Sequence, residues 1–258
     1  MKKYELLLND TIKVEDRTLY HIKALIDFSD IKAGDLGGYI EKEDNLSHEG
    51  NCWVYGNAIV YGNAKVFENA QVFENAQVYG NAWVCGNAQV FENAKVYGDA
   101  RVFGNAQVFE NAKVYGNAIV YGNAEVYGNA KVFGNAIVFG DAKVYGNAEV
   151  YGDASIFEDA RVFGNAWVYG NASICNNACI SSNDDIACIS YFGSENRTTT
   201  FFRNKDGSIG VVCGCFYGTL DEFRNEVKET HGDSHLAEEY LDIANLMEKR
   251  FKNREKEK

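Results

Sequence analysis

The sequence repeats a six-residue unit without interruption through the middle of the chain. Starting at Val54, a valine or isoleucine occupies every sixth position through Ile174, which gives 21 consecutive units, and an alanine lies four residues after each of them from Ala58 to Ala178. A period of six does not keep one face of a helix that has 3.6 residues per turn. The pattern instead predicts short strands, each followed by a corner, with the branched residue and the alanine pointing inward.

The third and fourth positions of each unit carry residues that suit corners. They are mostly Gly or Glu followed by Asn or Asp, as in the stretch VYGNAKVFENA from Val60 to Ala70. Glycine adopts positive φ without steric strain, and Asn tolerates the left-handed region better than most residues. Hexapeptide periodicity with a corner in every unit is typical of a parallel β-helix.

A slower modulation along the array predicts how many units close one coil. Every third unit from Val60 has glycine in the third position, and every third unit from Val72 begins a run of Glu74, Glu92 and Glu110. We therefore predict three sides and 18 residues per coil, with about seven coils in the array. At about 4.8 Å per stacked strand, the array should be roughly 34 Å long.

The unit V-x-G-N-A-x resembles the hexapeptide-repeat family over residues 54–180. This resemblance implies a left-handed β-helix shaped as a triangular prism. The chain departs from the family at the second position of the unit, which is aromatic nearly everywhere and predicted to point outward. One side carries Tyr61, Tyr79, Tyr97, Tyr115, Phe133, Tyr151 and Tyr169. The rings can stabilise the ladder by about 0.5–1.5 kcal/mol per pair, and they can form a binding surface. The two interpretations are compatible, and both remain.

Enzymatic activity is disfavoured by what the array lacks. Many hexapeptide-repeat proteins are acyltransferases, and the resemblance would imply a histidine base in a cleft between subunits. No histidine lies between His48 and His231, and no unit carries an insertion. Cys85 and Cys175 share a side but lie five coils apart, roughly 24 Å, which is too far to share a metal ion. We therefore predict no catalytic residues, no metal and no cofactor.

The two ends of the chain differ from the array and divide it into three parts. Residues 1–53 form a predicted N-terminal β cap, residues 54–182 the β-helix, and residues 183–258 a small α+β domain. In the cap, KYELLLND and TIKVEDRTLYHIKAL predict strands joined by polar turns, and Gly34, Gly37 and Gly38 predict a turn.

The C-terminal part predicts strands and two helices. CISYFG, RTTTFFR and SIGVVCGCF have strand character, and residues 204–207 predict a hairpin turn. Thr219 followed by Glu222 predicts a capping box at the start of a helix. A second apolar stripe predicts another helix from about Ser234, whose last seven residues are charged enough to fray.

Two constellations in this part are candidates for binding. The run GSENRTTT is expected to face the helix that starts near Thr219, where an arginine beside a helix N-terminus can hold an anion; a surface turn is the alternative. The candidate residues are Arg197, Thr199, Cys215, Thr219 and His231. Cys213 and Cys215, predicted on one strand face, are potential zinc ligands together with Cys188 and His231, but buried structural cysteines are favoured over a metal site.

Charge and polarity limit the partners. The formal net charge is −12, the wrong sign for neutralising phosphates, so we expect no nucleic acid. The start MKKYELLLND has too short an apolar run for a signal peptide or a membrane span, which predicts a cytoplasmic protein with no membrane partner. Trp83, Ile119 and Ile137 make one face of the prism more apolar than the others. With the stripe of the second helix, this face predicts a homo-oligomer, a dimer rather than a trimer.

The two ends also carry a more specific resemblance. DIKAGDLGGYIE, NLSHEGNCWVYGNA, NRTTTFFRNKDG and CGCFYGTLDEFRNEVKETHGD resemble a family of phage- and prophage-encoded repeat proteins, mostly uncharacterised. The resemblance implies an accessory protein inside an infected or lysogenic bacterium. Our leading hypothesis is a non-catalytic binding protein that inhibits a host or anti-phage defence component, such as a CRISPR-type nuclease. The alternatives are capture or turnover of a small molecule or nucleotide at the C-terminal domain, and a structural role in the virion or its assembly.

Overall fold

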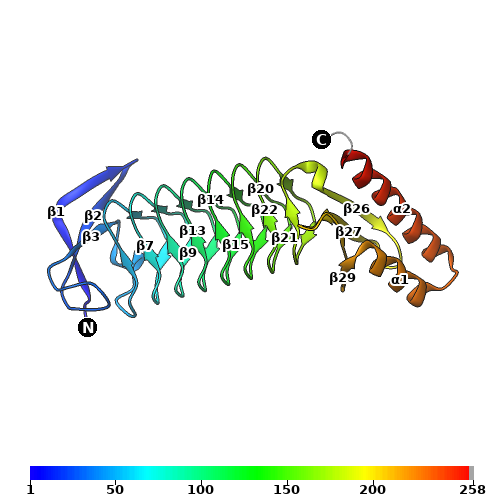
Figure 1. The fold of residues 1–258 in the computed structure, drawn as a ribbon. Helices are drawn as coiled ribbons and strands as arrows, with labels where there is room; N and C mark the ends of the chain where they lie inside the picture. Colours follow the sequence, from blue (N-terminus) through cyan, green and yellow to red (C-terminus); the bar gives the residue numbers. More distant parts are fainter. Residues whose placement is uncertain (256–258) are drawn as a thin grey trace.

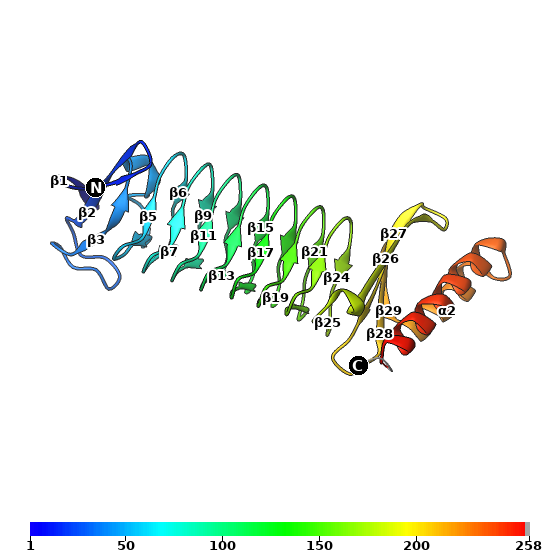
Figure 2. The same ribbon diagram turned by 90° about the horizontal axis from the view of Figure 1, so that it is seen from above.

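The structure is a computed structural model that describes residues 1–255. It consists of a long parallel β-solenoid with a small cap at its N-terminal end and an α+β domain at its C-terminal end (Figure 1). Figure 2, turned by 90°, shows the coils stacked one behind another along a single axis. The predicted fold class is therefore confirmed.

The solenoid contains 22 two-residue strands, from β4 to β25, within the described chain. They form three parallel sheets, which we call sheets I, II and III. Sheet I contains β5 (Ile59–Val60), β8 (Gln77–Val78), β11 (Lys95–Val96), β14 (Lys113–Val114), β17 (Lys131–Val132), β20 (Glu149–Val150) and β23 (Trp167–Val168). Sheet II contains β4 (Trp53–Val54), β7 (Gln71–Val72), β10 (Gln89–Val90), β13 (Gln107–Val108), β16 (Glu125–Val126), β19 (Lys143–Val144), β22 (Arg161–Val162) and β25 (Cys179–Ile180). Sheet III contains β6 (Lys65–Val66), β9 (Trp83–Val84), β12 (Arg101–Val102), β15 (Ile119–Val120), β18 (Ile137–Val138), β21 (Ser155–Ile156) and β24 (Ser173–Ile174).

The register of these sheets confirms three sides and an 18-residue coil. Lys95, for example, pairs with Lys113 on one side and with Gln77 on the other. The structure has one strand more than the 21 predicted units, because Ile180 continues the phase after Ile174. With β3 of the cap, which pairs in parallel with β5, the solenoid has about eight turns.

The core of the solenoid is the inward pair that the repeat predicted. Nearly every Val or Ile of the array and every Ala after it is fully buried, as at Val96 and Ala100. Burying a Val side chain contributes about 1.5–3 kcal/mol, and the array does so in every unit. Outside, the corner Asn residues form amide ladders that the sequence did not reveal: Asn105 Nδ2, for example, donates to Asn123 Oδ1 of the next coil at 3.0 Å.

The N-terminal cap contains β1 (Tyr4–Val14), β2 (Arg17–Ala24), β3 (Leu36–Ile40) and the short 3₁₀ helix η1 (Glu43–Asn45). The predicted break after KYELLLND is wrong, because β1 continues through it with a bulge between Leu7 and Thr11. The predicted turn at Gly37 and Gly38 is also wrong, since both residues belong to β3. A Cβ at Gly37 would lie 2.6 Å from the Val54 carbonyl oxygen, so this glycine permits close packing of the strand on the first coil.

The C-terminal domain begins after the 3₁₀ helix η2 (Asn183–Asp185). Its antiparallel sheet has the order β26 (Ile186–Phe192), β27 (Arg197–Arg203), β28 (Ile209–Cys213) and β29 (Phe216–Thr219). One face of the sheet, with Phe202 and Val212, continues the solenoid core, and the other face, with Phe201 and Val211, packs on the helices α1 (Leu220–His231) and α2 (His235–Glu255). The sheet therefore closes the apolar end of the solenoid (Figure 2).

Two predictions for this domain are confirmed and two are corrected. The hairpin between β27 and β28 and the Thr219–Glu222 capping box are present. SIGVVCGCF forms two strands instead of one, because the chain turns at Gly214, whose φ is 61°. The apolar stripe of α2 is buried in the domain's own core. Among the large apolar residues of α2, only Leu246 is substantially exposed, so this helix offers no broad apolar surface. The expected fraying concerns residues 252–258, of which 252–255 are helical and 256–258 lie outside the described residues.

No helix in residues 1–255 combines the length and the apolar character that crossing a lipid bilayer requires.

Candidate functional site

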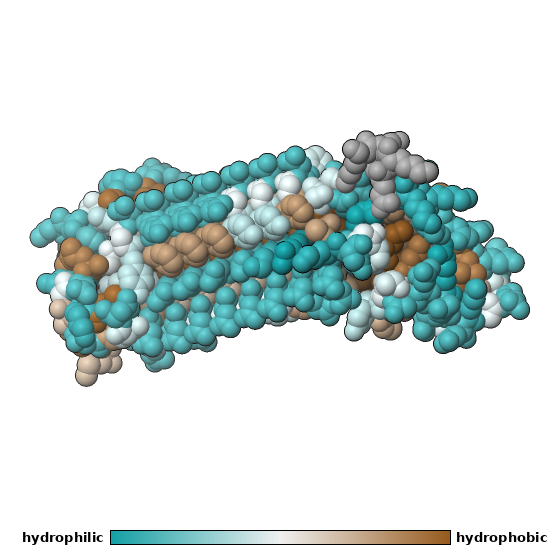
Figure 3. Space-filling view, in the orientation of Figure 1, coloured by the Kyte–Doolittle hydropathy of each residue, from teal (hydrophilic) through white to brown (hydrophobic). Residues whose placement is uncertain are grey.

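The predicted outward aromatics form stacked columns along the solenoid. In the tyrosine column, which runs from Tyr61 to Tyr169 and includes Phe133, successive ring centroids lie 4.9–5.3 Å apart and successive ring planes differ by 11° or less. A second column, which we call the phenylalanine column, runs from Phe73 to Phe163 with spacings of 4.7–5.0 Å. Figure 3 shows a row of apolar side chains, interrupted by a paler stretch, between rows of hydrophilic side chains along the solenoid. The repeat register places equivalent rings directly above one another, so stacking follows from the pairing of the strands.

The tyrosine rings are packed differently along the column. Tyr61 is 6% exposed because it packs beneath Leu19 of the cap, whereas Tyr169 at the other end is 57% exposed. Partial burial, together with the neighbouring phenols of Tyr61 and Tyr97, raises the pKa of Tyr79 to about 12. Burial likewise raises the pKa of Tyr97 and Tyr115. These three phenols are therefore uncharged at neutral pH.

The predicted apolar face on sheet III is smaller than the sequence indicated. Ile119 and Ile137 are direct neighbours on β15 and β18. Arg101 lies between them and Trp83 on β12, and its guanidinium covers the Trp83 ring at 5.1 Å from the centroid, although Trp83 remains 40% exposed. The continuous apolar part of this face is thus the Ile119–Ile137 pair.

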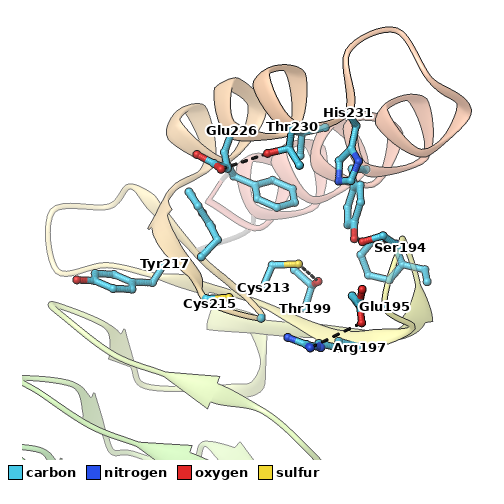
Figure 4. A pocket seen from close by; sticks show the side chains of 16 residues that line it. Ser194, Glu195, Arg197, Thr199, Cys213, Cys215, Tyr217, Glu226, Thr230 and His231 are labelled. Atoms are coloured by element: carbon cyan, nitrogen blue, oxygen red, sulfur yellow. Dashed lines mark hydrogen bonds and ion pairs between the residues drawn. The ribbon is translucent and has the colours of Figure 1, made fainter.

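The C-terminal domain contains a cavity of about 490 Å³ between α1 and the sheet (Figure 4). Arg197, Thr199, Cys215 and His231 all line it, so four of the five sequence-predicted ligand residues come together. Its apolar floor consists of Phe192, Phe216, Phe223, Val227 and Tyr240.

Thr219 does not line this cavity, because its hydroxyl and backbone N–H are engaged with Glu222 at the N-terminus of α1. The cavity instead lies beside the C-terminal half of that helix, with Glu226, Thr230 and His231. The expected arginine at a helix N-terminus is therefore wrong for this site.

The polar groups of the cavity are mostly paired with one another. Thr199 Oγ1 donates to Cys213 Sγ at 3.0 Å, and Thr230 Oγ1 donates to Glu226 Oε1 at 3.3 Å. Arg197 Nη2 lies 3.7 Å from Glu195 Oε2, and the Arg197 side chain is 56% exposed. The sequence interpretation included Glu195 only as part of the run GSENRTTT and missed Glu226 and Thr230, for which the four-residue spacing on a helix was the available indication. The site can hold a flat apolar group beneath a polar rim.

The strand register separates the cysteines that were considered for zinc. Cys188 pairs with Thr200 and Cys213 pairs with Thr199. Adjacent residues of a strand point to opposite faces, so Cys188 and Cys213 lie on opposite faces of the sheet. Cys215 lies in the turn after Gly214, not on the same strand as Cys213. Within residues 1–255, no three His, Cys, Asp or Glu side chains are grouped closely enough to hold a metal ion.

Comparison with known proteins agrees with the solenoid. Residues 76–92, 94–110 and 112–128 match the family model described as YdcK Beta solenoid repeat. A stretch of 37 residues is 51% identical to a protein of Escherichia coli (strain K12) named "Uncharacterized acetyltransferase YdcK"; it covers 14% of this chain and 11% of that protein. The chain is thus a repeat protein with a parallel β-solenoid, similar over part of its array to YdcK solenoid repeats.

Proposed function

We propose that the protein is a non-catalytic binding protein that uses its β-solenoid as a rigid surface for a protein partner. The observation that carries the proposal is the tyrosine column, in which each ring is held by its neighbours at 4.9–5.3 Å. Ordering flexible side chains opposes binding, and rings already held in place avoid most of that cost. Tyrosine also combines apolar area with a hydrogen-bonding hydroxyl, which suits it to protein interfaces.

The partner that we propose is a host or anti-phage defence protein, such as a CRISPR-type nuclease, that loses activity when the solenoid covers it. This part of the proposal rests on the resemblance of both chain ends to phage-encoded repeat proteins. The protein would act in the cytoplasm of the infected or lysogenic bacterium, without nucleic acid, membrane or cofactor. We further propose that it is a homodimer joined through the Ile119–Ile137 pair, since the stripe of α2 is already buried.

A plaque assay with paired variants tests inhibition. In a strain protected by a CRISPR-type nuclease, the wild-type chain should restore plaque formation by a targeted phage, whereas Tyr97→Ala with Tyr115→Ala should not. The matched control, Phe91→Ala with Phe109→Ala, removes two stacked rings from the phenylalanine column and should still restore plaques. Failure of the wild-type chain to protect phages against any defence system tested would count against inhibition.

Capture of a small molecule in the C-terminal cavity is the second candidate. Its volume of about 490 Å³ lies within the usual range of ligand pockets, about 300–1,000 Å³. The aromatic floor and the exposed cation of Arg197 suit an aromatic anion such as a nucleotide. Mass spectrometry of compounds released from the purified protein should then find one that is bound by wild type and by Lys205→Ala but lost in Arg197→Ala. Absence of any released compound would remove this candidate.

A further inference from the structure

The last strand of sheet I, β23, lacks the further coil that every earlier solenoid strand of this sheet has beyond it. Along sheet I, the N–H groups of the aromatic and corner residues donate to the next coil, as Tyr151 does to the Val168 carbonyl and Asp153 to the Gly170 carbonyl, both at 2.9 Å. In the described chain, the N–H groups of Tyr169 and Asn171 have no acceptor. Two backbone donors therefore point to the place that a further coil would occupy.

The space beyond these donors is open. A Cβ added to Gly152 would lie 2.9 Å from the Gly170 nitrogen of the next coil, but one added to Gly170 would meet no atom within 4 Å. Tyr169 stacks on Tyr151 and is 57% exposed. One face of the Tyr169 ring is thus available for a further ring at the spacing that the column already uses.

The wall opposite these donors is an edge strand. A cleft of about 760 Å³ lies between the sheet I end of the solenoid and β26 of the C-terminal domain, and it is lined by Tyr169 and Asn171 and by residues 186–190 of β26. Consecutive residues of a strand alternate between its two faces, so a cleft lined by five in a row follows the strand's edge. β26 is the outermost strand of its sheet, and exposed strand edges bind extended peptides.

A third donor lies in the same cleft. Arg250 of α2 lines it, and the buried Nε of this side chain has no hydrogen-bond partner among residues 1–255. Buried donors are normally paired, so an occupant with a carbonyl or carboxylate oxygen at this point would satisfy it. All three groups are donors, and the complementary occupant is therefore rich in acceptors.

We propose that this cleft docks an extended segment of a partner protein as one further rung of the solenoid. Backbone carbonyls of the segment accept from the N–H groups of Tyr169 and Asn171, and an aromatic side chain of the segment stacks on Tyr169. The two donors are two residues apart along the chain, which matches the repeat of carbonyls along an extended peptide. This assignment rests on the proposed protein-binding function and names the place and the chemistry of one contact.

A titration followed by nuclear magnetic resonance tests the rung on the full chain. The probe is the capped peptide acetyl-AEVYGDA-amide, the sequence of residues 148–154, which forms the rung directly below. The Tyr169 and Asn171 amide signals should shift downfield as they gain acceptors. Replacing the peptide tyrosine by alanine should weaken binding about threefold to tenfold, as loss of one ring pair predicts. Tyr169→Ala should weaken it similarly, whereas Phe91→Ala, in the phenylalanine column, should not.

Unchanged amide signals at millimolar peptide, or equal binding of the alanine peptide, would overturn the proposal. The binding function itself is tested separately by capture of a partner from infected cells. If the chain captures its partner and Tyr169→Ala captures it equally well, the rung is wrong and the binding function stands. If the peptide binds as described but no partner is captured, the rung stands and the proposed function is wrong.

Discussion

Tyr151 and Tyr169 stack with 5.3 Å between their ring centroids, and they form the last pair of a column in which every inner ring touches two others. An inner ring therefore contributes two stacking contacts and the terminal ring contributes one. Tyr97 stacks at 4.9 Å on both Tyr79 and Tyr115.

The first prediction compares an inner ring with the terminal ring. At about 0.5–1.5 kcal/mol per ring pair, Tyr97→Ala should lower the free energy of unfolding about twice as much as Tyr169→Ala. Urea unfolding followed by tryptophan fluorescence measures this, because Trp53, Trp83 and Trp167 all belong to solenoid strands. Equal losses for the two variants would mean that stacking does not stabilise the column.

The second prediction concerns glutamates in the left-handed region. Glu68 and Glu92 have φ of 61° and 56°, a conformation that costs a non-glycine residue of order 1–3 kcal/mol. Glu68 Oε2 accepts a hydrogen bond from the Gly86 N–H at 2.6 Å, but within residues 1–255 the Glu92 carboxylate has no partner and lies between Glu74 and Glu110 in the stack. Glu92→Gly should therefore raise the free energy of unfolding by about 1 kcal/mol.

Glu68→Gly is the matched control for that variant. It relieves the same backbone strain but removes a hydrogen bond to a charged group, which contributes about 1.5–3 kcal/mol, so it should not stabilise the protein. Urea unfolding of the two variants in parallel checks the difference. A destabilised Glu92→Gly protein would show that backbone strain at this corner is negligible.

The third prediction is a pH dependence of the C-terminal domain. Hydrogen bonds from Lys252 and Arg224 lower the pKa of Glu248 from its usual 4.5 to about 2. A carboxylate whose pKa is depressed in the folded protein contributes stability above its unfolded pKa, and that contribution is lost as the pH falls from 4.5 toward 2. The helical circular dichroism signal should show a smaller acid destabilisation in Glu248→Gln than in wild type, because both α-helices of the described chain belong to this domain.

Glu229→Gln removes the same charge from an exposed position on α1 and should retain the acid dependence of the wild type. If Glu248→Gln follows the wild-type curve as well, the contact between the two helices through Arg224 does not contribute to stability.

The fourth prediction concerns assembly. Ile119→Glu with Ile137→Glu places two carboxylates on the apolar pair of sheet III and should convert the proposed homodimer to a monomer. Gln89→Glu with Gln107→Glu adds the same charge to sheet II and should leave the dimer intact. Light scattering of the full chain measures both. A monomeric wild type, or a dimeric Ile119→Glu, Ile137→Glu protein, would contradict the prediction.

The repeat predicted the solenoid because its inward residues act locally and identically in every unit. Val96 and Ala100 both point inward because of their positions in the six-residue unit. The glycine at every third unit indicates three sides per coil without reference to any long-range contact. The ends are different, because their glycines and polar residues have several possible roles. Gly37 was predicted to lie in a turn because glycines cluster there. It lies in β3 instead, where the strand packs so close to the Val54 backbone that a side chain would not fit.

The residues of the candidate cavity were predicted only in part, because their arrangement depends on packing between elements. Arg197, Thr199, Cys215 and His231 were correctly grouped from the polar run and the helix that follows it. Thr219 was correctly identified as a helix cap, but which end of α1 faces the sheet depends on the packing of Phe223 and Val227, and neither residue alone indicates it. The opposite placement of Cys188 and Cys213 depends on strand register, which no local pattern specified.

A quantitative mass-spectrometric inventory of what co-purifies with the chain from infected cells tests the central claim most directly. We expect one host or defence protein to be enriched with the wild type and with Phe91→Ala, Phe109→Ala, and to be lost with Tyr97→Ala, Tyr115→Ala. Recovery of no protein, recovery of a small molecule alone, or recovery of the chain itself in purified virions would contradict the account of a binding protein that acts through its tyrosine column.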